Sequence, residues 1–152
     1  MSKTAVVEPH AVQQPSLLKR IQDMLGIRRL RSDRDLVRLV EERLAVGVVE
    51  GLRQSGLRDD EIYSLIVPRR TLTHRRARHE ALSREESDRA VRIARIAALG
   101  EQVFGETERA WRWLRATKRQ FEGRSPLQLT ATEAGARLVE ELLYRVDEGM
   151  AA

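Results

Sequence analysis

The chain has 152 residues, of which 41% are hydrophobic and 34% are charged, with four Pro and nine Gly. This composition favours a soluble, helix-rich fold with one core or two small ones. The absence of Cys excludes disulfides and thiolate metal sites, and three scattered His make a poor metal set, so we expect no metal and no cofactor. No run approaches the roughly 20 apolar residues of a membrane span, and no hydrophobic signal region begins the chain, so we expect a cytoplasmic protein without a membrane partner.

The net charge of +5 is placed unevenly along the chain. Through Leu82, sixteen Lys and Arg face eleven Asp and Glu, whereas from Ser83 onward twelve face twelve. This asymmetry favours an N-terminal part that binds a polyanion, joined to a neutral part with another task. A cationic surface that serves only solubility is the alternative.

Residues 1–16 contain two Pro and no sustained period, which predicts a flexible arm. A short amphipathic helix is expected next, with its apolar residues at Leu17, Leu18, Ile21, Met24, Leu25 and Ile27. Such a helix either packs on its neighbour or lies on a membrane or partner surface. The shortness of the apolar run favours packing.

Ser32 and Asp35 have the spacing of a helix start, and the pattern that follows predicts one long helix ending at Gly56. Its apolar edge is expected at Leu36, Val40, Leu44, Val48 and Leu52. Gly47 and Gly51 lie inside this helix, where each costs roughly 1 kcal/mol relative to Ala. A close helix crossing is one reason to keep them.

Residues 58–79 have the layout of a helix-turn-helix. Acidic residues 59–61 open a short helix, Val67 and Pro68 break it, and a basic helix anchored by Leu72 and the smaller Ala77 follows. The second helix of such a motif enters the DNA major groove, where Arg binds phosphate or guanine. The alternative is a solvated basic linker helix. The candidate DNA-binding residues are Arg69, Arg70, Thr71, Thr73, His74, Arg75, Arg76 and Arg78.

Ser83 and Glu86 form a second capping-box spacing, and the helix that they open is apolar around most of its girth. A helix buried on several sides favours a subunit interface in addition to an internal core. The candidate dimerisation residues are Val91, Ile93, Ile96, Leu99 and Val103. Gly105 is expected to end this helix, and Thr107 is expected to cap the next one.

Trp111 and Trp113 lie about 200 degrees apart on an ideal helix, so both cannot point into one core. One of them is therefore a candidate for contact with a partner, because Trp is enriched among interface anchors. Coverage by another helix of the same chain is the alternative, and spacing alone does not decide between the two residues.

The C-terminal stretch from Gly123 contains two more helix starts, Ser125 with Pro126 and Thr130 with Glu133. The last helix carries an apolar stripe at Ala134, Leu138, Leu142 and Val146, beside Gly135, Val139 and Leu143. We expect the first four to face the core of the protein. Gly149 is expected to end the helix and to leave Met150–Ala152 as a short free end.

No Gly-rich phosphate loop, metal-binding His pair or nucleophile arrangement is present, and the carboxylates sit at helix starts or beside Arg. The sequence therefore predicts a binding protein and not an enzyme.

The stretch LSREESDRAVRIARIAALGEQVFG, followed in order by AWRWL, GRSPLQL and TEAGARLVEELLYRVDEG, resembles the antitoxins of the Xre/MbcA/ParS-like family. The segment VPRRTLTHRR resembles the Xre-like helix-turn-helix that precedes this domain. The resemblance implies an all-α fold with a flexible arm (1–16), a helical DNA-binding region (17–81) and a toxin-binding and dimerisation domain (82–152).

Membership of that family implies the antitoxin of a type II toxin–antitoxin module. Its expected partners are a RES-domain toxin that degrades NAD, operator DNA, a second copy of the chain and larger toxin–antitoxin assemblies. The same resemblance implies that the C-terminal region blocks the toxin active site and that the protein represses its own operon, and we expect both of this chain. By position, the toxin-binding residues are Tyr144, Arg145, Asp147, Glu148, Gly149, Met150, Ala151 and Ala152, with Trp111 or Trp113 as further contacts.

Two other functions remain open on the residues alone. One is a stand-alone dimeric transcriptional regulator without a toxin partner. The other is a purely structural oligomer in which the Arg cluster only confers solubility.

Overall fold

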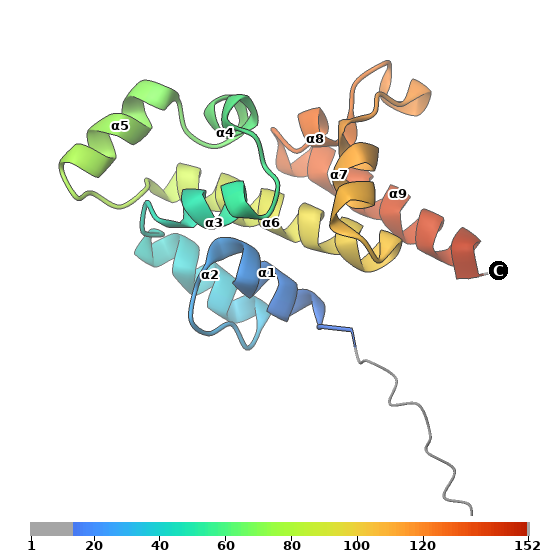
Figure 1. Ribbon diagram of the computed structural model, residues 1–152, viewed down its shortest axis with the longest axis horizontal. Helices are drawn as coiled ribbons and strands as arrows, with labels where there is room; N and C mark the ends of the chain where they lie inside the picture. Colours follow the sequence, from blue (N-terminus) through green and yellow to red (C-terminus); the bar gives the residue numbers. More distant parts are fainter. Residues whose placement is uncertain (1–13, 152) are drawn as a thin grey trace, which may run out of the picture.

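The computed structural model describes residues 14–151, and within this part of the chain all regular structure is helical, as expected (Figure 1). The expected arm at 1–16 therefore lies mostly outside the described residues, as does Ala152. The elements are α1 (Leu17–Leu25), α2 (Asp33–Glu42), α3 (Val48–Gln54), α4 (Asp59–Leu65), α5 (Arg69–Ala77), α6 (Arg84–Phe104), α7 (Thr107–Arg115), the 3-10 turn η1 (Arg119–Phe121), α8 (Pro126–Leu129) and α9 (Glu133–Ala151).

Helix α6 is the centre of the fold. It packs against α1, α2 and α3 and also against α7 and α9, and Figure 1 shows it running lengthwise between these two groups. Ser83 accepts the backbone N–H of Glu86 at 3.1 Å, and Gly105 ends the helix in the left-handed region at φ 70°, both as predicted. Because both groups of helices bury apolar side chains against α6, the described chain has one continuous core.

Helix α1 packs on its neighbours, which confirms the first of its two interpretations. Ser16 caps it, and Ile21, Met24 and Leu25 are buried against α3 and α6. A Cβ at Gly51 of α3 would lie 2.5 Å from the backbone oxygen of Met24. Gly51 therefore marks the close crossing that the sequence suggested, whereas a Cβ at Gly47 would meet nothing.

The long helix expected from Ser32 to Gly56 is wrong, because α2 ends at Glu42 and α3 begins at Val48. Arg43 turns the chain with φ 68°, and its guanidinium donates to the carbonyl of Leu82 at 2.8 Å. Leu44 and Leu82 are also joined by a backbone hydrogen bond of 2.9 Å, and Leu44 N–H donates to the Ser87 hydroxyl. Hydrogen bonds to a segment about forty residues away thus replace those of a continuous helix, and no local pattern reports them.

The acid-started helix and the break at Pro68 are found as predicted. Residues Asp59, Asp60 and Glu61 occupy the first turn of α4, and Pro68 is the N-cap of α5. The expected cap at Thr107 is wrong. Glu106 holds the N-cap position of α7, and the Thr107 hydroxyl donates instead to Glu101 at 2.9 Å.

Three expectations for the C-terminal stretch need correction. Thr132, and not Thr130, caps α9, since its hydroxyl accepts the N–H of Gly135 at 3.0 Å. Thr130 is buried at the end of α8. Gly149 does not end α9, which continues to Ala151, so that Met150 and Ala151 are helical instead of a free end.

The stripe assigned to the core is rotated in the structure. The buried edge of α9 consists of Gly135, Ala136, Val139 and Leu143. Ala134 and Leu138 are exposed, and Leu142 and Val146 are only partly buried. The sequence offered two adjacent apolar edges, and the one that packs inward carries the glycine. Gly135 lets α9 lie close to α8, because a Cβ there would lie 1.9 Å from the carbonyl oxygen of Leu129.

Candidate functional site

Helix α5 presents a cationic surface away from the core. Leu72, which is 1% exposed, anchors the helix, whereas Ala77, the second expected anchor, is exposed. A shallow hollow of about 560 Å³ is lined by Arg69, Arg70, Thr73, His74 and Ala77. Arg76 and Arg78 are exposed beside it, and Thr71 is half-buried. Six of the eight candidate DNA-binding side chains are thus open to solvent.

Arg75 is set apart from the rest of α5. Its guanidinium forms two hydrogen bonds with the Glu86 carboxylate of α6, of 2.8 and 3.0 Å, and lies 3.5 Å from Glu80. Burial raises the pKa of Glu86, but hydrogen bonds from Arg75 and from the N–H of Ser83 outweigh it and lower that pKa overall. Arg75 therefore connects α5 to α6, a role that no local pattern distinguishes from that of the neighbouring arginines.

The turn between α4 and α5 is fixed from the other side by α6. Arg89 donates to the carbonyl of Ile66 at 2.9 Å, and Val67 at the turn is fully buried. Since Pro68 has no N–H to satisfy, α5 starts directly after this anchored turn. The spacing between α4 and α5 is therefore rigid, as recognition by a helix-turn-helix requires.

Helix α7 is joined to α4 by an ion pair and to the end of α3 by a buried indole. Arg115 donates to both oxygens of Glu61, at 2.9 and 2.7 Å, and to the carbonyl of Gly56 at 2.7 Å. Trp111 donates its indole N–H to the carbonyl of Ser55 at 2.7 Å, and its ring stacks under Arg115. These contacts link the helix that precedes the basic helix to the C-terminal helices.

The two tryptophans are thereby distinguished. Trp111 is 4% exposed and is covered by the same chain, which is the alternative that the sequence left open for one of the two residues. Trp113 is partly buried against Phe104, with ring centroids 5.6 Å apart, and Lys118 lies over its ring. Only Trp113 has surface to offer a partner.

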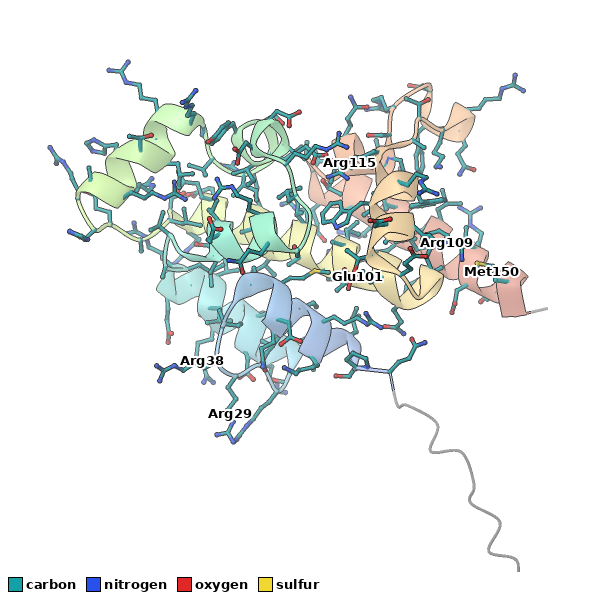
Figure 2. All side chains as sticks on the ribbon, in the orientation of Figure 1. Arg29, Arg38, Glu101, Arg109, Arg115 and Met150 are labelled. Atoms are coloured by element: carbon teal, nitrogen blue, oxygen red, sulfur yellow. The ribbon has the colours of Figure 1, made fainter. Side chains whose placement is uncertain are left out.

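Helix α9 carries three of the four large apolar side chains that are exposed in the described chain. Of the four large apolar side chains that are exposed, Leu138 (49%), Tyr144 (51%) and Met150 (56%) are on α9, and the fourth is Val37 on α2. Residues 147–150 are all exposed, and Figure 1 shows the end of α9 extending past the other helices. Arg145, Asp147, Glu148 and Gly149 thus lie on a helical end that the rest of the chain does not cover. Met150 is labelled at this end in Figure 2.

An ion-pair network fixes the start of α9 on α6. Arg92 donates to Glu133 at 3.1 Å and to the carbonyls of Thr130 and Ala131 at 3.3 Å. Arg95 bridges Glu133 and Glu140 at 3.0 and 2.6 Å. Because α9 is held along its first two turns, its outer face and its end have a defined direction.

The candidate dimerisation residues of α6 are core residues in this structure. Ile93 and Ile96 are 1% exposed and Leu99 is 2% exposed, while Val91 and Val103 are 6% and 7% exposed. Their burial comes from helices of the same chain, which accounts for the internal core that the sequence predicted, while a subunit interface at these residues stays a prediction. Val91 and Leu99 do line the floor of a groove of about 770 Å³ between α2, α6 and α9, whose rim includes Tyr144.

Among the described residues, no helix has both the length and the apolar character that crossing a membrane requires.

Two family descriptions match successive parts of the chain. The Antitoxin Xre-like helix-turn-helix domain matches residues 35–95, and the Antitoxin Xre/MbcA/ParS C-terminal toxin-binding domain matches residues 99–149. The two matches meet within α6. A protein of Pseudomonas putida named Antitoxin Xre is 37% identical over 130 residues, which cover 86% of this chain and 82% of that protein. A second Antitoxin Xre, of Yersinia enterocolitica, is 33% identical over 85 residues, covering 55% of this chain and 57% of that protein.

Proposed function

This chain belongs to the Xre/MbcA/ParS-like antitoxins, and we propose that it neutralises a RES-domain, NAD-degrading toxin by covering the toxin active site with the end of α9. The general function, an antitoxin with a helix-turn-helix DNA-binding domain, follows from the family. The identity of the toxin and the means of inhibition are the proposal.

One observation supports α9 as the toxin-binding element above the others. Three of the four large exposed apolar side chains in the described chain lie on it, and none of residues 147–150 is buried. Exposed apolar side chains with a charged surround are typical of a protein-binding surface. A helix end that contributes nothing to the core is free to enter a cleft of a partner.

A truncation tests this assignment. Deletion of residues 147–152 removes no buried side chain from the described core, so the protein should fold with an unchanged circular dichroism spectrum and melting temperature. When it is co-expressed with the toxin encoded next to it, growth arrest and NAD loss should return. Full neutralisation by the truncated protein would place inhibition elsewhere, and loss of folding would show that the end of α9 is structural.

Point variants make the test sharper. Tyr144→Ser and Leu138→Ser should each weaken toxin binding about tenfold or more, because an anchor side chain contributes about 2 kcal/mol or more. Val37→Ser, at the similarly exposed apolar residue of α2, is the matched control and should bind normally. Binding is measured by titration calorimetry with a catalytically inactive toxin.

The second part of the proposal is repression of the antitoxin's own operon through α5. The exposed residues Arg69, Arg70 and Arg76, together with Thr73 and His74, face one side of a helix whose approach is fixed by the anchored turn. Electrophoretic mobility shift with the promoter fragment, with and without the toxin, tests repression. Replacement of Arg69, Arg70 and Arg76 by Ala should abolish the preference for the promoter over random DNA.

The proposal also includes assembly into a homodimer and into larger toxin–antitoxin complexes. Since Ile93 and Ile96 are buried within one chain, we expect a dimer contact of α6 to involve Val91 and Leu99, which line the groove between α2, α6 and α9. Mass measurement of the free protein and of the co-purified complex determines both stoichiometries. A monomer at micromolar concentration would contradict the dimer.

A further inference from the structure

A second group of exposed arginines lies at the connection between α1 and α2. Figure 2 shows Arg29 and Arg38 extending from the edge of the molecule next to these helices, while α5 lies at the far upper corner of the same view. The five arginines fall within eleven residues and all are exposed: Arg28, Arg29, Arg31, Arg34 and Arg38. We call this group the α1–α2 arginine surface.

None of these five arginines takes part in an ion pair within the described part of the chain. Arg75, Arg92 and Arg115, by contrast, are all paired with carboxylates. Two acidic residues lie among them: Asp33 in the first turn of α2, and Asp35, which accepts the N–H of Arg31 at 2.8 Å and of Ser32 at 3.1 Å. Five arginines against two aspartates leave this surface with a net charge of +3.

The α1–α2 stretch and the α5 stretch contain the same number of arginines. Residues 26–39 hold five Arg and two Asp, and residues 68–80 hold five Arg and one Glu. Outside these two stretches, 20 Asp and Glu outnumber 18 Lys and Arg. The whole net positive charge of the chain thus comes from two places, only one of which belongs to the helix-turn-helix.

The backbone that carries the arginines is held in place. Gly26 ends α1 with φ 63°, the Gln22 side chain accepts the N–H of Leu30 at 2.9 Å, and Leu30 is 7% exposed. The capping box of α2 follows at once. Arginines on a fixed backbone lose less conformational freedom on binding than arginines on a loose loop.

Three of the guanidinium groups surround one shallow hollow of about 290 Å³. It is lined by Arg29, Arg31 and Arg38 together with Asp35 and Leu39. Leu39 is the one apolar lining residue and is partly buried. The hollow therefore offers no exposed apolar anchor of the kind that protein interfaces use, and its donors suit phosphate oxygens.

We propose that the α1–α2 arginine surface is a second DNA contact that binds the phosphate backbone of duplex DNA without regard to sequence. Because α5 and this surface are separate parts of the molecule, the surface adds a phosphate contact beyond those of α5 (Figures 1 and 2). It raises affinity through release of counterions and leaves sequence choice to α5. The inference does not depend on recognition of a promoter by α5.

The test uses the full-length protein and a random-sequence duplex, with binding measured by fluorescence anisotropy at several salt concentrations. The R29A/R31A/R38A variant should bind about tenfold or more weakly at low salt, and the slope of log affinity against log salt should fall by about 3, because each lost phosphate contact removes about 0.9. The R29K/R31K/R38K variant should restore most of the salt slope.

A variant of equal charge serves as the control. R109A/R112A/R119A removes three exposed arginines of α7 and η1 that form no ion pair in the described chain, and its affinity for the duplex should change less than twofold. An equal loss in this control would attribute the effect to net charge and overturn the proposal. So would an unchanged salt slope for R29A/R31A/R38A, or loss of toxin binding with DNA affinity intact, which would make this a protein-binding surface.

The variant R69A/R70A/R76A distinguishes this inference from promoter recognition. It should lose the preference for promoter over random duplex, whereas R29A/R31A/R38A should weaken both by the same factor and keep the preference. If R69A/R70A/R76A keeps the preference, recognition by α5 fails while the α1–α2 arginine surface stands. If R29A/R31A/R38A loses only promoter binding, the surface reads sequence and the inference fails.

Discussion

Arg115 of α7 donates hydrogen bonds to both carboxylate oxygens of Glu61 of α4, at 2.7 and 2.9 Å, and the two residues lie 54 positions apart in the sequence. Glu61 also accepts the N–H of Arg58 at 2.9 Å, so one carboxylate both caps the first helix of the helix-turn-helix and holds the C-terminal helices to it. The half of the protein that we propose to bind the toxin is thus connected directly to the half that we propose to bind DNA. The two side chains are only 20% and 12% exposed, which limits screening by solvent.

Glu61→Gln should lower the free energy of unfolding by about 1 to 3 kcal/mol, because Arg115 then loses a charged partner at a largely buried position. Asp59→Asn, which disturbs the more exposed pair with Arg53, is the control and should cost at most about 1 kcal/mol. Urea unfolding followed by circular dichroism measures both. If both variants lower the free energy of unfolding equally, the Arg115–Glu61 contact stabilises the fold no more than the exposed Arg53–Asp59 pair does.

Stability should fall at acid pH in a defined range. Burial raises the pKa of Glu61, but the hydrogen bonds from Arg115 and Arg58 lower it more, and the Glu86 pKa is lowered in the same way by Arg75 and Ser83. A carboxylate whose pKa is lower in the folded state stabilises fully above its unfolded value of 4.5, and this contribution is lost as the pH falls through the folded value.

The free energy of unfolding should therefore change little through these groups from neutral pH to about pH 5 and should decline below the unfolded pKa. Urea titrations at a series of pH values measure it. The Glu61→Gln, Glu86→Gln double variant should be less stable at neutral pH and show a shallower decline. A decline of the same steepness in both proteins would assign the acid sensitivity to other carboxylates.

Gly135→Ala should lower the free energy of unfolding, although replacing a glycine by alanine inside a helix usually raises it. Alanine normally stabilises a helix interior by up to about 1 kcal/mol over glycine. At Gly135, however, the new methyl group would lie 1.9 Å from the Leu129 carbonyl oxygen, and backbone cannot move aside as a side chain does. Gly149→Ala, where a Cβ meets nothing within 4 Å, is the matched control and should be neutral or stabilising. A thermal melt of both variants decides the matter.

Arg75→Ala and Arg76→Ala should behave differently although they are neighbours on α5. Arg75→Ala leaves Glu86, which is 5% exposed, without its cation and should lower the free energy of unfolding by about 1 to 3 kcal/mol. Arg76→Ala should leave stability within about 0.5 kcal/mol and weaken DNA binding with a reduced salt slope. Chemical unfolding and anisotropy on both proteins test this. If Arg75→Ala is as stable as the unmodified protein, Arg75 is again a candidate for DNA contact.

Trp111→Phe should cost about 1 kcal/mol or more, because the phenyl ring leaves the Ser55 carbonyl without its indole donor. Trp113→Phe should cost less in stability, since Trp113 makes no such hydrogen bond in the described structure and is only partly buried. Fluorescence of each single-Trp protein gives the second readout: toxin binding should shift the emission of Trp113 and leave that of Trp111 unchanged. A shift of Trp111 alone would reverse the assignment.

The sequence by itself determined the features that depend on neighbours along the chain. The caps at Ser32, Ser83 and Ser125, the stop at Gly105 and the break at Pro68 were all predicted, since each is a hydrogen bond or a backbone restriction within a few residues. The all-α fold and the family resemblance follow from the same local patterns. The exposed basic helix could be predicted too, because its lone anchor Leu72 leaves only one narrow side to bury.

The tertiary structure alone decided which surfaces remain free. The predicted helix breaks at Arg43 because Leu82 accepts a hydrogen bond from the Arg43 guanidinium and Ser87 accepts one from the N–H of Leu44. The four-residue period places Leu138 on the core stripe and Leu143 beside it, yet the tertiary packing exposes Leu138 and buries Leu143. Likewise Arg75 and Arg76 differ only in whether a carboxylate of α6 lies opposite. Local patterns report hydrogen bonds and propensities, whereas the partner that covers a face is chosen by long-range contacts, and those contacts define the binding surfaces of this antitoxin.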